Sequence, residues 1–157
     1  MSCPEEIVTL EAFWRMKRGD RLLPSRADFA PEELRPWLGN IGKVVVERGD
    51  DDALRFRVTL SGTRLDDYRG HSITGQYIDE ICYTTDTSPY YETCVATREP
   101  VHFLHDNSAN SAIYRNMAKL LLPLGDDGVT VDRVLVAIYP LRANDTALPL
   151  ADYALAG

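Results

Sequence analysis

The chain has 157 residues, 45% of them hydrophobic, which suits one domain with a hydrophobic core of its own. Its 24 acidic and 17 basic side chains give a net charge of −7, and an acidic surface repels the phosphates of nucleic acids. Because no apolar run reaches about 18 residues and the acidic start lacks the apolar core of a signal peptide, we expect a cytoplasmic protein with no nucleic-acid or membrane partner.

The spacing of apolar residues predicts an N-terminal helix over residues 5–19, preceded by Pro4 and ended by Gly19. A helix of this length is not stable alone in water, so its apolar face needs a partner. That partner is either the chain's own domain or the same helix of a second subunit. For the second case, the candidate dimer-interface residues are Ile7, Leu10, Phe13 and Trp14.

A linker and a short helix lead into the first two predicted strands. Residues 22–29 are typical of a linker, and residues 30–34 of a short helix that begins with a proline and two acids. The β-branched run within 41–48 and the alternation over 54–60 predict two antiparallel strands joined by a polar turn. The alternation places one set of side chains on the apolar face, namely Leu54, Phe56, Val58 and Leu60.

The middle of the chain predicts short helices rather than strands. Residues 62–68 are expected to form a helix that Gly70 ends, and residues 79–82 one more helical turn. Ser88 is expected to cap the longest internal helix, which runs over residues 89–98. These helices separate the first two strands from the strands that follow.

Three further strands are predicted over residues 101–106, 112–124 and 131–141, and residues 142–157 form a C-terminal tail. Helices gathered in the middle of antiparallel strands indicate an α+β domain. We therefore expect a five-stranded antiparallel sheet with the central short helices on one face and a separate N-terminal helix. The other face of such a sheet is left to water or to a partner.

Four segments in order resemble the PAS domain superfamily, in particular a small bacterial stand-alone family that opens with an LPSRxDFxPxEL-type motif. They are residues 23–34 (LPSRADFAPEEL), 56–63 (FRVTLSGT), 68–75 (YRGHSITG) and 121–132 (LLPLGDDGVTVD). The third segment departs from the family's Tyr-Gly-Arg step, because its Gly and Arg are exchanged. The resemblance covers residues 22–141.

The resemblance implies a single PAS-like domain over residues 1–157, with the PAS core at 22–141, the N-terminal helix at 5–19 and the tail at 142–157. It also implies a cytosolic sensory or regulatory role, often as a homodimer. The family has no shared catalytic residues to transfer, and its ligands are generally undefined.

The histidines and cysteines predict neither a metal site nor a recognised cofactor. His102 and His105 differ by three positions on a predicted strand, so they point to opposite faces and cannot share one metal. Haem-binding PAS domains usually take a histidine from the long central helix, and residues 89–98 contain none. A covalent flavin needs a reactive cysteine in an Asn-Cys-Arg-Phe-Leu-Gln-like loop, which does not surround Cys82. We therefore disfavour haem and covalent flavin, and the cofactor stays unknown.

Catalytic motifs are also absent from the sequence, so we expect no enzymatic activity and no catalytic residues. There is no Gly-x-Ser-x-Gly sequence and no phosphate-cradling glycine loop. The paired carboxylates at 66–67 and 126–127 are neighbours that do not converge on one substrate. Cys94 is expected to be buried on its helix and therefore unreactive.

A curved sheet beneath short helices leaves room for a cavity between them. We expect a sensory domain that binds a small molecule or a protein partner, forms a homodimer and acts on a signalling protein in trans. The alternatives are a dimerisation or adaptor domain with a filled core and no ligand, and a small α+β enzyme. The candidate pocket residues are Phe56, Val58, Leu60, Leu65, Tyr68, Tyr91, Val95, Phe103, Tyr114 and Val136.

Overall fold

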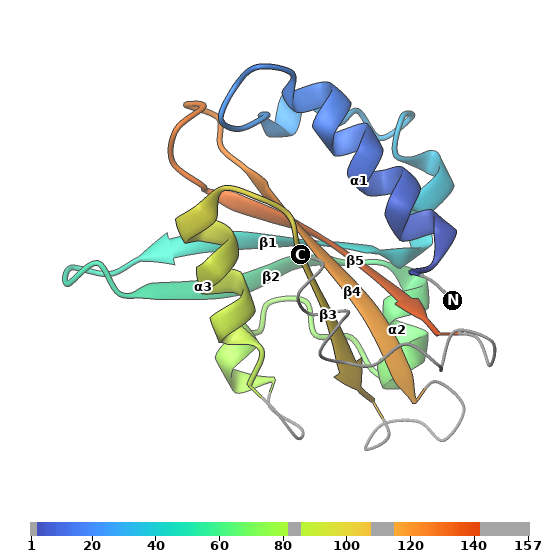
Figure 1. Cartoon of the computed structure of the whole chain (residues 1–157). Coiled ribbons are helices and arrows are strands. Elements are labelled where there is room, and N and C mark those ends of the chain that lie inside the picture. Colours follow the sequence, from blue (N-terminus) through green and yellow to red (C-terminus); the bar gives the residue numbers. More distant parts are fainter. Residues whose placement is uncertain (1–2, 82–85, 108–114, 142–157) are drawn as a thin grey trace.

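The computed structural model describes residues 3–81, 86–107 and 115–141. It contains one five-stranded sheet in the order β2-β1-β5-β4-β3, in which every neighbouring pair is antiparallel (Figure 1). The strands are β1 (Ile41–Arg48), β2 (Leu54–Ser61), β3 (Val101–Asp106), β4 (Asn116–Leu124) and β5 (Arg133–Pro140). The helices are α1 (Glu5–Arg18), α2 (Thr63–Arg69) and α3 (Ser88–Thr97), and the 3-10 turns are η1 (Arg26–Asp28), η2 (Arg35–Asn40) and η3 (Ile78–Glu80).

The predicted α+β order of elements is confirmed, with a few differences at their ends. Residues 31–34 form a turn rather than a helix, and the helical segment begins only at Arg35. Ser88 does not cap α3 with its side chain. Instead its backbone N–H donates a hydrogen bond of 2.9 Å to the Asp86 carboxylate, which satisfies a free N–H at the start of the helix. The start of the strand predicted over residues 112–124 lies in part outside the described residues.

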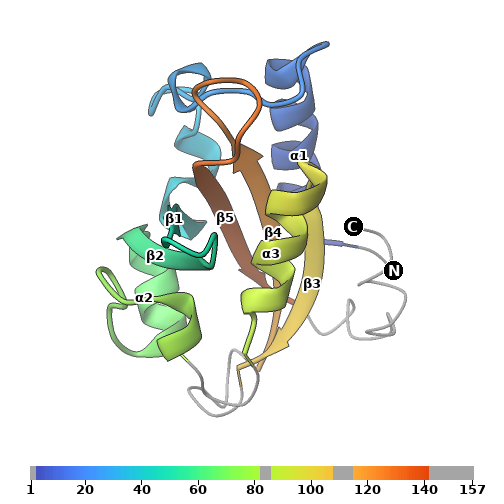
Figure 2. The ribbon, with the colours of Figure 1, turned by 90° about the vertical axis from the view of Figure 1, so that its left-hand side faces the viewer.

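Both faces of the central strands are buried, so the expected solvent-facing side of the sheet is closed over β4 and β5 (Figure 2). Side chains alternate along these strands between two hydrophobic clusters. The α3 face packs beneath α2, η3 and α3 and includes Leu121, Val134, Val136 and Ile138. The α1 face packs against α1 and η2 and includes Leu120, Leu122, Leu135 and Ala137.

Helix α1 is attached to its own sheet through its apolar side. Ile7, Leu10 and Trp14 have no exposed surface, and the Trp14 indole Nε1 donates a hydrogen bond of 2.9 Å to the carbonyl oxygen of Pro123. Phe13 stacks on the ring of Trp37 with centroids 5.6 Å apart. The prediction of a dimer interface is therefore wrong for Ile7, Leu10 and Trp14, because the chain's own core already covers them. It stays a prediction for Phe13, which is only partly buried against the same core.

A polar contact adds a second link between α1 and the sheet. The Glu11 carboxylate forms a hydrogen bond with Nε2 of His102 on β3, where both side chains are largely buried. The hydrogen bond from His102 is the largest cause that lowers the pKa of Glu11. Burial opposes a charge on His102, but its hydrogen bonds with Cys3 and Glu11 outweigh that effect and raise the pKa of His102 to about 9.

Glu11→Gln is expected to lower the free energy of unfolding by about 2 kcal/mol near pH 6, because it leaves the protonated His102 without its carboxylate. A raised His102 pKa stabilises the fold fully below the unfolded-state value near 6.5, and this contribution disappears as the pH rises through about 9. The difference between wild type and variant should therefore shrink between pH 6.5 and 9. Urea denaturation at several pH values measures it.

Glu92→Gln is the matched control for this experiment, since Glu92 is exposed on α3. It should change the free energy of unfolding by less than about 0.5 kcal/mol at every pH. An equal effect of the two substitutions, or a Glu11→Gln effect that does not change with pH, would contradict the proposed link between α1 and β3.

Within the described part of the chain, every helix is too short or too polar to cross a bilayer.

Candidate functional site

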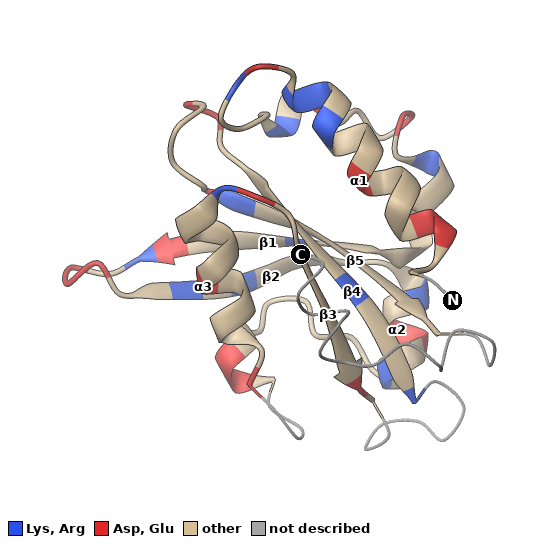
Figure 3. Ribbon diagram, viewed as in Figure 1, with Lys and Arg blue, Asp and Glu red and all other residues tan. Residues whose placement is uncertain are grey.

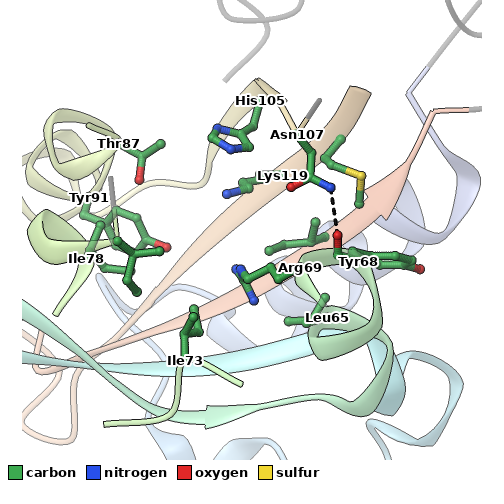
Figure 4. A pocket seen from close by; sticks show the side chains of 13 residues that line it. Leu65, Tyr68, Arg69, Ile73, Ile78, Thr87, Tyr91, His105, Asn107 and Lys119 are labelled. Atoms are coloured by element: carbon green, nitrogen blue, oxygen red, sulfur yellow. Dashed lines mark hydrogen bonds between the residues drawn. The ribbon is translucent and has the colours of Figure 1, made fainter. Parts of the chain in front are cut away.

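A pocket opens on the α3 face, between the short helices and strands β3, β4 and β5. The space between its side chains measures about 540 Å³ when its opening to solvent is included. Its apolar lining consists of Leu65, Ile73, Ile78, Ile81, Met117 and Ile138. Its polar lining consists of Tyr68, Arg69, Thr87, Tyr91, His105, Asn107 and Lys119 (Figure 4).

Helix α2 forms one wall and is fixed to the sheet by two buried asparagines. The Asn107 side-chain amide donates a hydrogen bond of 2.9 Å to the backbone oxygen of Tyr68, which ties the end of β3 to α2. The Asn40 amide donates to the Tyr68 hydroxyl at 2.8 Å and to the Ile138 carbonyl oxygen at 3.0 Å. Gly70 ends the helix in the left-handed conformation, at a φ of 83°, which glycine adopts without strain.

Helix α3 forms the opposite wall with the side chain of Tyr91. This ring packs on Phe56 of β2 with centroids 5.3 Å apart and is almost fully buried. Burial raises the pKa of the Tyr91 hydroxyl, so the group stays neutral and able to donate a hydrogen bond. Burial also raises the pKa of the Cys94 thiol on the same helix, as expected for an unreactive cysteine.

The most unusual member of the lining is Lys119, which projects from the middle of β4. In Figure 3 this strand is uncharged except for one basic band, and Lys119 is its only charged residue. The residue is 8% exposed, and its ammonium lies over the Phe103 ring at 5.6 Å from the centroid. Burial and then the charge of Arg69 lower the pKa of Lys119 to about 7.

Three basic side chains thus border the same space in the pocket. Arg69 comes from α2, His105 from β3 and Lys119 from β4, and Figure 4 shows all three directed into the same space. Burial, followed by the charges of Lys119 and Arg69, lowers the pKa of His105 to about 4, so its imidazole is neutral at pH 7. None of the residues that line the pocket in the described structure is acidic. The site therefore combines apolar walls with basic side chains and no acidic one among its described residues.

The structure divides the predicted pocket residues into four groups. Leu65, Tyr68 and Tyr91 line the main pocket. Val58, Leu60 and Val136 line a smaller adjoining pocket, which shares with the first pocket the residues Leu65, Arg69, Ile73, Ile78, Tyr91 and Ile138. Phe56, Val95 and Phe103 belong to the packed core or lie against it. Tyr114 lies outside the described residues.

Leu60 lies at the rim and is 47% exposed, so its predicted place on the buried face of β2 is wrong. The reason is a β-bulge. Lys43 pairs with Leu60 whereas Val44 pairs with Val58, so β2 has one extra residue at this point. An extra residue breaks the two-residue alternation, and the side chains beyond it no longer follow the pattern set by Phe56 and Val58.

The basic residues of the pocket were not predicted from the sequence. A signal for one of them exists, because Lys119 is the single charged residue in the apolar run Met117–Leu124. A continuous apolar strand is buried on both faces, so a lysine within it must also be buried. Arg69 and His105 lie near element ends, where charged residues are common, and carry no comparable signal.

The two histidines of β3 point to opposite faces, as predicted. His102 contacts Glu11 on the α1 face, whereas His105 lines the pocket on the α3 face. In the described residues no group of three or more His, Cys, Asp or Glu side chains is arranged to hold a metal ion.

Comparison with known proteins identifies the type of fold. A family model described as "PAS domain" matches residues 4–139. The light-state structure of the LOV domain of the blue-light photoreceptor Aureochrome1 superposes with a TM-score of 0.51 at 10% identity, covering 79% of this chain and 97% of that one. A light-oxygen-voltage domain studied with a flavin analogue gives a TM-score of 0.50 at 12% identity, covering 80% and 87%. A search of curated protein sequences gave no match.

Proposed function

Because this chain belongs to the PAS domain family, we propose that it is a sensory domain whose pocket on the α3 face binds a small molecule and signals the bound state to a partner protein. The observation that carries this proposal is a pocket with apolar walls and convergent polar groups, which is the usual form of a small-molecule site. The buried Lys119 adds to it, since a charged group inside an apolar wall is costly without a binding role.

The solved light-oxygen-voltage domains share the fold, and their low identity supports no transfer of their chemistry. Cys94 is buried on α3 with a raised pKa, and Cys82 lies outside the described residues. We therefore propose a non-covalently bound small molecule. The family also supports a regulatory role in preference to a catalytic one.

Signalling in trans requires a free surface on the domain. The apolar side of α1 does not provide it, because Ile7, Leu10 and Trp14 are covered by the chain's own sheet. If the protein forms a homodimer, we propose that it does so through another surface. A ligand would then act only by binding the two states of that surface with different affinity.

Native mass spectrometry of the protein purified from its own cells tests the proposal. The wild type is expected to show an additional small mass that is lost on denaturation. Leu65→Trp, which places an indole in the pocket, should abolish that mass, whereas Leu38→Trp on the exposed part of η2 should retain it. A wild-type spectrum with the mass of the chain alone, or a bound mass that persists in Leu65→Trp, would contradict ligand binding at this site.

A further inference from the structure

We infer that the ligand of this pocket is a small organic acid, whose acidic group contacts Lys119 and Arg69 and whose apolar part lies against Leu65, Ile73 and Ile78. This inference rests on the proposed function, because it names the chemical class that the proposed pocket accepts. Its first support is the position of Lys119. The side chain is 92% buried, and the structure assigns its ammonium no hydrogen bond or ion pair within the described residues, only the ring of Phe103.

A buried ammonium is costly unless an anion lies beside it. An aromatic ring offsets part of this cost, by about 0.5–2 kcal/mol, but does not supply the hydrogen-bond acceptors that an ammonium needs. The pocket itself offers no carboxylate, because its described lining contains no Asp or Glu. Asp106, which follows His105 on β3, is exposed and does not line the pocket. A ligand with an acidic group would supply the missing charge.

Arg69 strengthens this reasoning because it places a second positive charge in the same space. The guanidinium comes from α2 and the ammonium from β4, so the two approach the pocket from different elements (Figure 4). An acidic group placed between them would be attracted by both charges. His105, neutral at pH 7, and the neutral Tyr91 hydroxyl add hydrogen-bond donors around the same space.

The remaining walls define the rest of the ligand. Three aliphatic side chains of the lining, Leu65, Ile73 and Ile78, are largely buried and have no polar atoms. They favour an apolar body, since burial of apolar surface contributes about 25 cal/mol for each Å² removed from water. The site therefore selects an acid with a short hydrocarbon or ring portion, and it disfavours cations.

Thermal unfolding with three probes that each contain five carbons tests the inference: pentanoate, pentan-1-ol and pentan-1-amine. At about ten times its dissociation constant, pentanoate should raise the Tm of the wild type by roughly 3 °C or more. Pentanol should bind at least about tenfold more weakly, since it forms no charge-assisted hydrogen bond, and the amine more weakly still. Propylphosphonate serves as a second acid. A larger Tm shift with it than with pentanoate would support the inference and would indicate that the acidic group is of the phosphate type.

Lys119→Met should reduce the preference for pentanoate over pentanol to less than about twofold while the pocket keeps its volume. Lys43→Met is the matched control and should leave that preference unchanged. Lys43 is an exposed lysine of β1 beside a separate surface pocket that also contains Arg26 and Arg133. If the preference for the acid is lost in Lys43→Met instead, the acid binds at that other pocket and the inference is wrong.

The outcomes also separate this inference from the proposed function. Equal binding of pentanoate and pentanol, or tighter binding of the amine, would overturn the acidic class and leave a ligand-binding pocket standing. No stabilisation by any probe, together with no bound mass in the native spectrum, would overturn the pocket as a ligand site altogether.

Discussion

Trp14→Ala is expected to lower the free energy of unfolding by about 3–5 kcal/mol, the largest loss that we predict for a single side chain. Trp14 has no exposed surface, and its removal leaves a cavity between α1 and the α1 face of the sheet. The substitution also deletes the hydrogen bond from the indole to Pro123, so that the backbone oxygen loses this partner. Urea denaturation followed by far-UV circular dichroism measures the change.

Met16→Ala is the matched control, since Met16 lies on the same helix and is 67% exposed. It should change the free energy of unfolding by less than about 0.5 kcal/mol. If Trp14→Ala were no more destabilising than Met16→Ala, α1 would not be packed on its own sheet. A second subunit would then become the better explanation for its apolar side.

Lys119→Met is expected to stabilise the ligand-free protein by about 2–4 kcal/mol at pH 6, the opposite of a usual core substitution. Methionine has a similar shape and no charge, so the cost of burying an ammonium disappears while the packing is kept. Burial and Arg69 hold the pKa of Lys119 near 7 in the folded state, against a usual value of 10.5. The charge is therefore unfavourable for folding.

The pH dependence of this effect follows from the direction of the pKa shift. Below pH 7 the lysine is protonated in both states, and its full cost is present. Between pH 7 and about 10 the folded state releases its proton while the unfolded state keeps it, so the wild type gains stability. The advantage of Lys119→Met should thus decrease over this range. Urea denaturation at pH 6, 8 and 10 measures it.

Lys43→Met provides the control, because Lys43 is an exposed lysine on the same sheet. It should show a small effect without this pH trend. A Lys119→Met protein that is less stable than the wild type at pH 6 would contradict a buried, uncompensated charge. The trend is opposite in sign to that of His102, so each must be measured as a difference from its own variant.

The sequence alone predicted the elements of the sheet well, because their patterns are local. The alternation in β2, the β-branched run in β1 and the glycines that end α1 and α2 each depend on neighbouring residues only. The predicted range of β1 agrees with the structure at both ends. The predicted range of α1 is one residue too long, because it includes Gly19. These are the segments in which propensity, capping and pattern favour the same structure.

Features that depend on contacts between distant segments were predicted less well. The bulge that exposes Leu60 arises from the pairing of β1 with β2, and no pattern within β2 reveals it. The closure of the second face depends on where α1 lies, which its own amphipathic pattern does not specify. The pattern showed that Trp14 needs a partner, and only the fold identifies that partner as β4 and its neighbours.

The candidate site was predicted in part. Its aromatic and aliphatic members, such as Leu65, Tyr68 and Tyr91, follow from the pattern of buried positions on short helices. The charged members that define its chemistry were missed, because Arg69 and Lys119 are 50 residues apart in the sequence and converge only when α2 and β4 line the same pocket. The local signal for these charged members is a lysine, Lys119, within an otherwise apolar strand.

The most direct test of ligand binding in this pocket is a map of amide chemical shifts recorded while the protein is titrated with pentanoate. The largest shifts are expected at residues 65–69 of α2, at Tyr91, and around His105 and Lys119, which face one another across the space. The account would be contradicted if the signals of these residues did not change and the shifts were confined to the α1 face or spread over the surface. The acid would then bind elsewhere, and the residues of this pocket would be part of the packed core.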